Sequence, residues 1–318
     1  MIEKPLVSLV VRCYQAERFI KEAIDGALNQ TYKNLEIIFS DDASTDRTFE
    51  IIKEKLKEYK GIHSIVLNRN KKNLGIGANF NKVVFEIAKG DWIVIADGDD
   101  ISLPNRVERL MEFAKDEVAA IHHSNILINE NSDEIFAEEA YIKVLEVFAK
   151  NNIEETIRKN ICLRGASMCL NKKMINLFGE LNENIIHEDV VFAYRAQYFG
   201  NIVHLDEKLI KYREHHSSTT YNHSIKTFEK YLTTKKKIAK KLLTTYYQIL
   251  EDNKILNLST NFLKELSIKS ELNKIDLFLY DNGLFEKKFL IIPAFYKRVI
   301  KMQLKKIHFW GSNLINAQ

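Results

Sequence analysis

The sequence is poor in the residues that interrupt or cross-link a fold. Its 318 residues include only 3 prolines, 11 glycines and 3 cysteines. Cys13, Cys162 and Cys169 are odd in number and form no C-x-x-C pair, which argues against a disulfide framework or a zinc site and favours a reducing compartment. No apolar run approaches the roughly 20 residues that a membrane-spanning helix needs, and residues 1–5 have no signal-peptide pattern. We therefore expect a cytoplasmic location, in solution or at the inner face of the cytoplasmic membrane.

An excess of one charge sign is also missing. Lys and Arg together number 47 and Asp and Glu 43, so the formal net charge is +4. This excess is too small to indicate nucleic-acid binding, and we expect no nucleic-acid partner. The hydrophobic fraction of 46% and the charged fraction of 28% are ordinary for a globular protein. The length allows one large domain with a smaller one beside it.

Strand-like and helix-like segments alternate over the first hundred residues. The apolar runs predict strands at 6–12, 35–40, 62–67 and 92–96, and apolar residues at helical spacing predict helices within 20–28, 51–59 and 80–88. Such alternation is typical of an α/β fold in which helices flank a mostly parallel sheet.

The pattern loosens after residue 120. We expect strands at 119–129, 165–170, 202–204 and 209–212, and a helix at 188–198. From about residue 224 the sequence becomes rich in Lys, Leu and Ile and poor in Pro, which predicts a C-terminal helical extension over 224–318.

Three of the predicted strands end in polar or acidic clusters, at residues 13–17, 41–46 and 97–100. In wound parallel sheets ligands bind beyond the carboxyl ends of the strands, so these clusters are expected to meet at one binding edge.

The acidic cluster Asp97-Gly98-Asp99 follows an Ile-Val-Ile strand. Two carboxylates on one short turn offer the oxygen ligands that Mg²⁺ or Mn²⁺ prefers, with positions left for phosphate oxygens. Gly98 would let the backbone approach the ligand without a Cβ. The alternative is a solvated Asp-Gly turn without a ligand, but the preceding strand and the following segment 103–106 favour metal and diphosphate binding.

In its motifs the chain resembles the family 2 glycosyltransferases, an inverting family with the GT-A fold, a Rossmann-like α/β fold, that builds bacterial surface glycans. The resemblance covers about residues 5–220 and rests on an ordered set of segments: 7–11, 27–32, 41–46, 73–75, 90–92, 97–100, 188–189 and 212–215. It implies a catalytic domain over 1–223, with a nucleotide-sugar half at about 1–118 and an acceptor half at about 119–223.

The resemblance also implies donor-binding residues by position. Tyr14 would wall the nucleotide base, Asp42 would hydrogen-bond its edge, and Asn73 would lie near the nucleotide. Asp97 would contact the ribose and Asp99 would ligate the metal. The expected donor is a nucleotide diphosphate-sugar, with UDP as the expected carrier and dTDP or GDP left open, and the expected ion is Mn²⁺ or Mg²⁺.

The chain departs from the family after its first strand. The family usually has Pro-Thr-Tyr-Asn there, whereas this sequence has Arg12-Cys13-Tyr14-Gln15. Arg12 could contact the diphosphate or an acidic neighbour, and its role stays open. Cys13 is expected to be a small buried residue, since no neighbouring base would make it a nucleophile.

Inverting transfer needs a base for the proton of the acceptor hydroxyl. His187-Glu188-Asp189 opens a predicted helix, whose dipole would keep a carboxylate ionised. The alternative is simple capping of the helix. The resemblance implies that Asp189 is the general base, and we expect Glu188 to orient the acceptor or its neighbours.

Histidines and an arginine complete the list of candidates. His215 is a candidate ligand of the metal or the diphosphate, His216 a weaker one, and Arg213 could pair with phosphate. His122 and His123 either contact the acceptor or are structural.

The segment 287–310 combines a basic stripe with aromatic and apolar residues. It suits a helix lying in a membrane surface, or one packed on the catalytic domain or on the second subunit of a homodimer. A lipid-linked acceptor would make the membrane reading useful.

We therefore expect an inverting glycosyltransferase that acts on a glycan or lipid-linked glycan acceptor. A nucleotidyltransferase is the first alternative, although residues 11–15 contain no Gly-rich phosphate loop. A catalytically inactive nucleotide-sugar-binding scaffold is the second, and the presence of Asp97, Asp99 and Asp189 argues against it.

Overall fold

The computed structural model describes residues 4–135, 162–215, 228–256 and 266–270, and also 153, 156, 273, 274 and 277. The chain divides into two compact units, Met1–His223 and Ser224–Gln318. Where the second unit is described, its long helix is α9 (Phe228–Leu256). In the part of the chain that is described, no helix has both the length and the apolar character required to cross a membrane.

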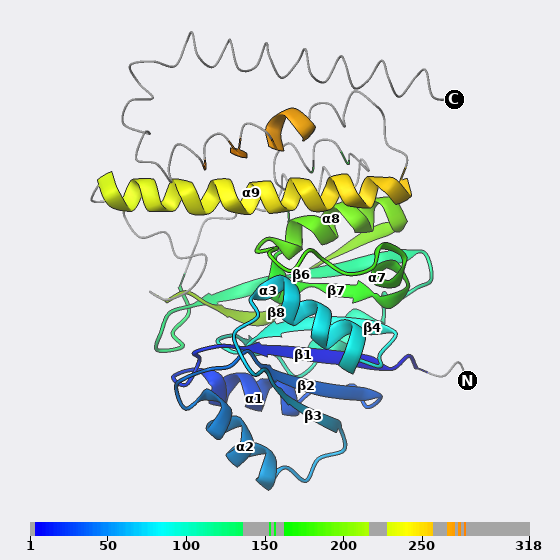
Figure 1. The fold of residues 1–318 in the computed structure, drawn as a ribbon. Helices are drawn as coiled ribbons and strands as arrows, with labels where there is room; N and C mark the ends of the chain where they lie inside the picture. The colour runs from blue at the N-terminus through cyan, green and yellow to red at the C-terminus, as the bar shows by residue number, and fades with distance from the viewer. Residues whose placement is uncertain are drawn as a thin grey trace. The chain divides into compact units, whose positions relative to one another are not determined.

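The first unit is built on one eight-stranded sheet with the order β3-β2-β1-β4-β7-β6-β8-β5 (Figure 1). Its strands are β1 (Val7–Cys13), β2 (Leu35–Asp41), β3 (Ser64–Arg69), β4 (Trp92–Asp97), β5 (Ile101–Ser102), β6 (Val118–Ile128), β7 (Cys169–Asn171) and β8 (Asn201–Arg213). Neighbours among β1 to β4 pair in parallel, and so do β6 and β8. β7 is antiparallel to both β4 and β6, and β5 is antiparallel to β8.

Helices follow most of the strands. They are α1 (Ile20–Leu28), α2 (Thr48–Glu58), α3 (Ile76–Asn81), which continues as the π-helix η1 (Lys82–Ile87), α4 (Arg106–Met111), the 3₁₀ turn η2 (Gly165–Ser167), α7 (Lys172–Phe178) and α8 (Glu188–Phe199). The alternation predicted for the first hundred residues is therefore present.

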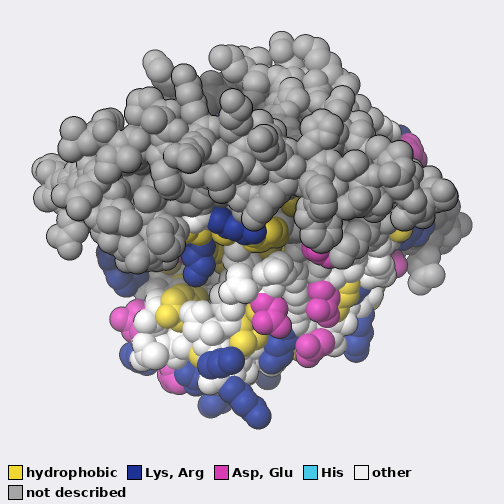
Figure 2. Space-filling view, turned by 45° about the horizontal axis from the view of Figure 1, so that its top comes forward, with side chains coloured by type: hydrophobic (Ala, Val, Ile, Leu, Met, Phe, Trp, Pro, Cys, Tyr) yellow, Lys and Arg dark blue, Asp and Glu magenta, His cyan; other side chains and the backbone are white. Residues whose placement is uncertain are grey.

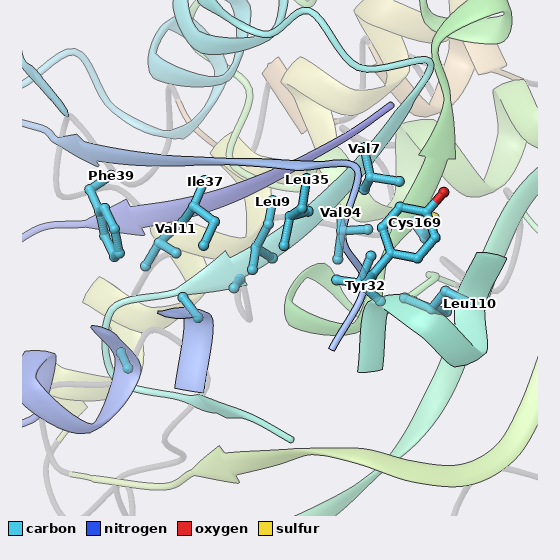
Figure 3. Packing of buried hydrophobic residues seen from close by; sticks show 14 of the residues in the cluster. Val7, Leu9, Val11, Tyr32, Leu35, Ile37, Phe39, Val94, Leu110 and Cys169 are labelled. Atoms are coloured by element: carbon cyan, nitrogen blue, oxygen red, sulfur yellow. The ribbon is translucent and has the colours of Figure 1, made fainter. Parts of the chain in front are cut away.

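Alternation along the strands divides the core between the two faces of the sheet. Val7, Leu9 and Val11 of β1 lie in one buried cluster with Ile37 and Phe39 of β2 (Figure 3). The same cluster contains apolar residues of α1 and α2, so these two helices cover this face. On the face drawn in Figure 2, charged side chains of both signs lie among hydrophobic ones over the described surface.

The second half of the unit differs from the sequence-based prediction. The segment predicted as a strand at 165–170 begins with η2, and β7 starts only at Cys169. The two short strands predicted at 202–204 and 209–212 are a single strand, β8. The polar residues 206–208 in the middle of β8 interrupt its apolar pattern and made one strand look like two. At this place the pairing of β8 with β6 is also irregular, between His123 and Asn125 of β6.

Candidate active site at the carboxyl ends of β1, β2 and β4

The central strand β1 brings the three polar clusters together. Arg12 lies opposite Asp97 in the parallel register of β1 and β4, and Cys13 lies opposite Asp41 of β2. The backbone carbonyl of Arg12 accepts a hydrogen bond from Gly98 N at 2.8 Å, and that of Cys13 accepts one from Asp42 N at 2.8 Å. The loops after β1, β2 and β4 therefore meet at one edge of the sheet.

The loops after β1 and β2 are locked by Gln15. Its side-chain Oε1 accepts hydrogen bonds from Thr45 N at 2.9 Å and Asp46 N at 3.2 Å, and its backbone N donates to Ser44 Oγ at 3.0 Å. Gln15 has a φ of 51°, which points to a tightly constrained turn. The neighbouring Tyr14 is 52% exposed, so its ring is accessible for the predicted contact with a base.

Asp42 holds the loop that follows β3. One carboxylate oxygen accepts from Leu74 N at 2.9 Å and from Asn70 Nδ2 at 2.8 Å, and the other accepts from Gly75 N at 2.9 Å. Asn73 is exposed within the same loop. Asp42 thus shapes the surface where a nucleotide is predicted to bind, and its contact with the base itself stays a prediction.

The acidic turn after β4 is tightly packed on its inner side. A Cβ at Gly98 would lie 3.2 Å from Ile20 Cδ1 and 3.3 Å from Arg12 O. Internal crowding is therefore a reason for glycine at this position, besides the predicted close approach of a ligand. Asp100 is 3% exposed, and its Oδ1 accepts a hydrogen bond from Arg213 N at 2.8 Å.

Arg12 connects this turn to the helix that carries the predicted base. Its Nε donates to Asp97 Oδ1 at 2.8 Å and its Nη2 to Asp97 Oδ2 at 3.1 Å, while Nη1 donates to Glu188 Oε1. Of the two roles left open for Arg12, the structure shows the contact with acidic neighbours. Glu188 is buried in contact with Arg12, and its expected role in orienting the acceptor stays a prediction.

Asp189 lies in the first turn of α8, directly after Glu188. Burial, followed by the charge of Glu188, raises the pKa of Asp189 to about 6. A hydrogen bond from Val190 N at 2.9 Å and the thiol of Cys162 oppose this rise. The helix dipole was expected to lower the pKa of this carboxyl group, but burial has the larger effect and raises it. With a pKa of about 6, the carboxylate is still largely ionised at pH 7. The N-cap residue His187 makes no side-chain capping bond, and the bond from Val190 N is the contact of Asp189 with the backbone of this first turn.

Asp99 and His215 form the candidate metal pair. Asp99 Oδ2 lies 2.9 Å from His215 Nε2, close to the separation of about 3 Å expected for adjacent ligands of an octahedral ion bound at about 2.1 Å. His215 is 7% exposed and its ring packs on Phe19, with ring centroids 4.8 Å apart. Within the described residues no group of three or more His, Cys, Asp or Glu side chains is arranged to hold an ion. In the structure the two atoms are within hydrogen-bond distance of each other, and an ion held by this pair would take its other ligands from substrate and water.

The charge of the turn also fits a cation. Burial, together with the charges of Asp99 and Asp97, raises the pKa of Asp100 well above its usual range. Oδ2 of Asp100 is buried without a hydrogen-bond partner. A divalent cation near the turn would favour the charged form of Asp100, whereas Asp97 is already paired with Arg12.

Arg213 is not available for phosphate, and that expectation was wrong. Its Nε donates to Asp99 O at 2.8 Å, Nη1 donates to Ser132 Oγ at 2.9 Å, and Nη2 pairs with Glu22 Oε2 at 2.8 Å. The side chain is fully buried. Arg213 instead fixes the backbone of the acidic turn. The residues that flank Arg213 in the sequence did not predict these contacts.

The two histidines of β6 are structural. Both are fully buried, so the expected alternative of contact with an acceptor is not supported. His123 Nε2 accepts a hydrogen bond from Arg106 Nε at 2.9 Å. His122 packs against His204 with ring centroids 4.5 Å apart, and burial lowers its pKa to about 3, which keeps the ring neutral.

Cys13 is buried, as expected. Burial, and then the charges of the neighbouring aspartates, raises the pKa of its thiol well above the usual range, so it is not a nucleophile. His216 and the segment 287–310 lie outside the described residues, so their predicted roles stay predictions.

Sequence reasoning missed two partners in the site. The first is the contact of Arg12 with Glu188, which only the fold brings together. The second is Cys162, whose thiol hydrogen-bonds Asp189. The unusual Arg after the first strand was the available signal for the first, whereas no signal in the sequence pointed to the second.

Comparison with known proteins identifies the family of the chain. Residues 8–178, more than half of the chain, match the model of Glycosyl transferase family 2. An uncharacterized glycosyltransferase of Haemophilus influenzae is 29% identical over 303 residues, which cover 90% of this chain and 88% of the relative. The putative glycosyltransferase EpsE of Bacillus subtilis is 41% identical over 109 residues, which cover 34% of this chain but only 38% of EpsE.

Solved structures show the same fold. The mannosyltransferase PcManGT from Pyrobaculum calidifontis, in complex with GDP-Man and Mn²⁺, has a TM-score of 0.55 at 14% identity, covering 100% of this chain and 89% of that one. TarS of S. aureus, in complex with UDP-GlcNAc, has a TM-score of 0.54 at 13% identity, covering 87% of this chain and 92% of that one. These likenesses confirm the predicted GT-A fold. By its sequence match and its fold, the chain belongs to glycosyl transferase family 2 and is a glycosyltransferase.

Proposed function

We propose that the chain transfers a sugar, with inversion, from a nucleotide diphosphate-sugar to a hydroxyl group of a glycan or lipid-linked glycan. The observation that carries the proposal is the contact of Arg12 with both Asp97 and Glu188. It places the acidic turn, where a diphosphate would bind, beside the helix start that carries Asp189.

The proposed reaction is a single displacement. The acceptor oxygen attacks the anomeric carbon, Asp189 takes the hydroxyl proton, and the bond between that carbon and the diphosphate oxygen breaks with its electrons leaving on the diphosphate. A base with a pKa of about 6 is ionised and ready to accept this proton near neutral pH.

Residues of the acidic turn would serve the leaving group. Asp99 and His215 would hold Mn²⁺ or Mg²⁺, which when bound supplies positive charge to the departing diphosphate. Asp97 would contact the ribose, while the loops carrying Tyr14 and Asn73 would enclose the base. In this proposal residues 1–118 bind the donor and 119–223 the acceptor.

The proposed classes of donor and acceptor come from similar proteins, namely from the nucleotides bound in their structures and from the acceptor in the name of one relative. TarS was solved with UDP and UDP-GlcNAc, which supports a UDP-sugar, and PcManGT was solved with GDP-Man. The Escherichia coli protein WfaP, 33% identical over 126 residues, is named as a glucosyltransferase acting on a GlcNAc-diphosphoundecaprenol. A lipid-linked acceptor would suit action at the cytoplasmic face of a membrane, with 287–310 as the proposed contact.

The proposal is tested by incubating the protein with UDP-Glc, UDP-GlcNAc, UDP-Gal, UDP-GalNAc, GDP-Man and dTDP-Glc, with and without Mn²⁺. We expect release of nucleoside diphosphate from at least one donor, and we expect it to require the ion. Formation of a nucleoside triphosphate and a sugar 1-phosphate when pyrophosphate is added to the donor, the reverse of nucleotidyl transfer, would instead indicate a nucleotidyltransferase. Nucleotide binding without any release would favour the inactive scaffold and contradict the proposed function.

A further inference from the structure

The guanidinium of Arg12 contacts carboxylates from two distant parts of the chain. Asp97 lies 85 residues away and Glu188 lies 176 residues away. The side chains of Arg12 and Glu188 are only 14% and 5% exposed. Ion pairs shielded from water in this way are stronger than surface pairs, and they are costly to break on one side only.

The surroundings of Arg12 leave its guanidinium little freedom. Its backbone is held in the central strand β1 between β2 and β4. A Cβ on Gly165 would lie 3.4 Å from Arg12 Nη2 and 3.4 Å from Glu188 Oε1, so the backbone at Gly165 closes over the pair. A planar guanidinium can donate to two carboxylates in fixed directions, which a lysine ammonium cannot do from the same place.

The two contacts have different consequences because they reach different parts of the site. Asp97 belongs to the turn that contains Asp99, on the donor side. Glu188 precedes Asp189 in the first turn of α8, so holding Glu188 also holds the backbone from which the Asp189 carboxylate projects.

We propose that Arg12 is a positioning residue with two arms, one that fixes the donor-side turn through Asp97 and one that fixes the base-bearing start of α8 through Glu188. This inference rests on the proposed function, in which Asp189 is the base. It predicts that the two arms have separable effects. Loss of the Asp97 arm weakens nucleotide binding, and loss of the Glu188 arm slows turnover.

The test is a double-mutant cycle of Arg12→Met and Glu188→Ala. UDP binding in the presence of MnCl₂ is measured by calorimetry, and kcat is measured as nucleoside diphosphate release from the best donor of the panel; where that donor carries another nucleotide, its diphosphate replaces UDP. We expect Glu188→Ala to lower kcat about tenfold with nucleotide affinity within about twofold. Arg12→Met should lower kcat similarly and also weaken nucleotide binding about fivefold or more. The double variant should bind as weakly as Arg12→Met, with no further loss of kcat.

Arg109→Met is the matched control, because Arg109 also lies between two carboxylates, those of Glu112 and Glu207, but at a 31% exposed position outside the site. It should leave both constants unchanged. Arg12→Lys keeps the charge but can reach only one of the two carboxylates. It should therefore recover part of the kcat loss or part of the loss of nucleotide affinity, but not both. Circular dichroism identifies a temperature at which every variant is folded, and the binding and rate constants are compared at that temperature.

Equal factors of kcat loss from Arg12→Met in the wild-type and Glu188→Ala backgrounds would overturn the proposal, as would unchanged constants in folded Arg12→Met. If Asp189→Asn is inactive while Arg12→Met turns over like the wild type, only the role of Arg12 is refuted. A wild type that releases no nucleoside diphosphate, or an active Asp189→Asn, would overturn the proposed function and this inference with it.

Discussion

Asp189→Asn is expected to lower sugar transfer by a factor of roughly 10²–10⁴, the usual contribution of a general base. The amide has nearly the shape of the carboxylate but cannot accept the acceptor's proton. Nucleotide affinity should stay within a few-fold, because Asp189 lies on α8 and not on the donor-binding loops. Steady-state kinetics and UDP titration of the same preparation measure the two quantities.

The pH profile provides the control for this variant. Because burial and Glu188 raise the pKa of Asp189 to about 6, the wild-type rate should fall as the pH drops below about 6, where the base becomes protonated, and level off above it. The residual rate of Asp189→Asn should lack this limb. Equal losses of turnover and nucleotide affinity would instead show that Asp189 is structural or acts on the donor side.

Asp99→Ala is expected to abolish ion-dependent donor binding. The ion supplies several kcal/mol to charge stabilisation, so its loss should reduce turnover by about 100-fold or more. Calorimetry should show UDP binding that no longer responds to MnCl₂.

Asp116→Ala is the matched control for Asp99→Ala. Asp116 has a 92% exposed side chain that pairs with the surface residue Lys173, so its removal should change neither binding nor turnover. Unchanged Mn²⁺-dependent binding in Asp99→Ala would remove Asp99 from the metal site.

The donor half of the fold could be predicted because its signals are local. Strands β1, β2 and β4 are apolar runs that end abruptly in polar residues, and α1 has its apolar residues at helical spacing. The second half mixes signals. β5 has 2 residues and β7 has 3, too short for a periodic pattern, and α7 has only 7 residues.

The sequence indicated which residues are candidates for the site, but not which side chains they contact. The acidic turn and Asp189 came from residue types and from the family resemblance, and the structure brings them together through Arg12. The partners of Arg213 could not be predicted, because Glu22 lies 191 residues away and Ser132 lies 81 residues away. Such pairings depend on the register of distant strands, which one sequence does not reveal.

The central claim is that an ion on the acidic turn and the base on α8 face the same substrate. A crystal structure with Mn²⁺ and UDP tests it most directly. We predict the ion bound to the Asp99 carboxylate, His215 Nε2 and the diphosphate oxygens, with the Asp189 carboxylate directed toward the same space. An ion bound elsewhere, or an Asp189 carboxylate turned away from the diphosphate, would contradict the account.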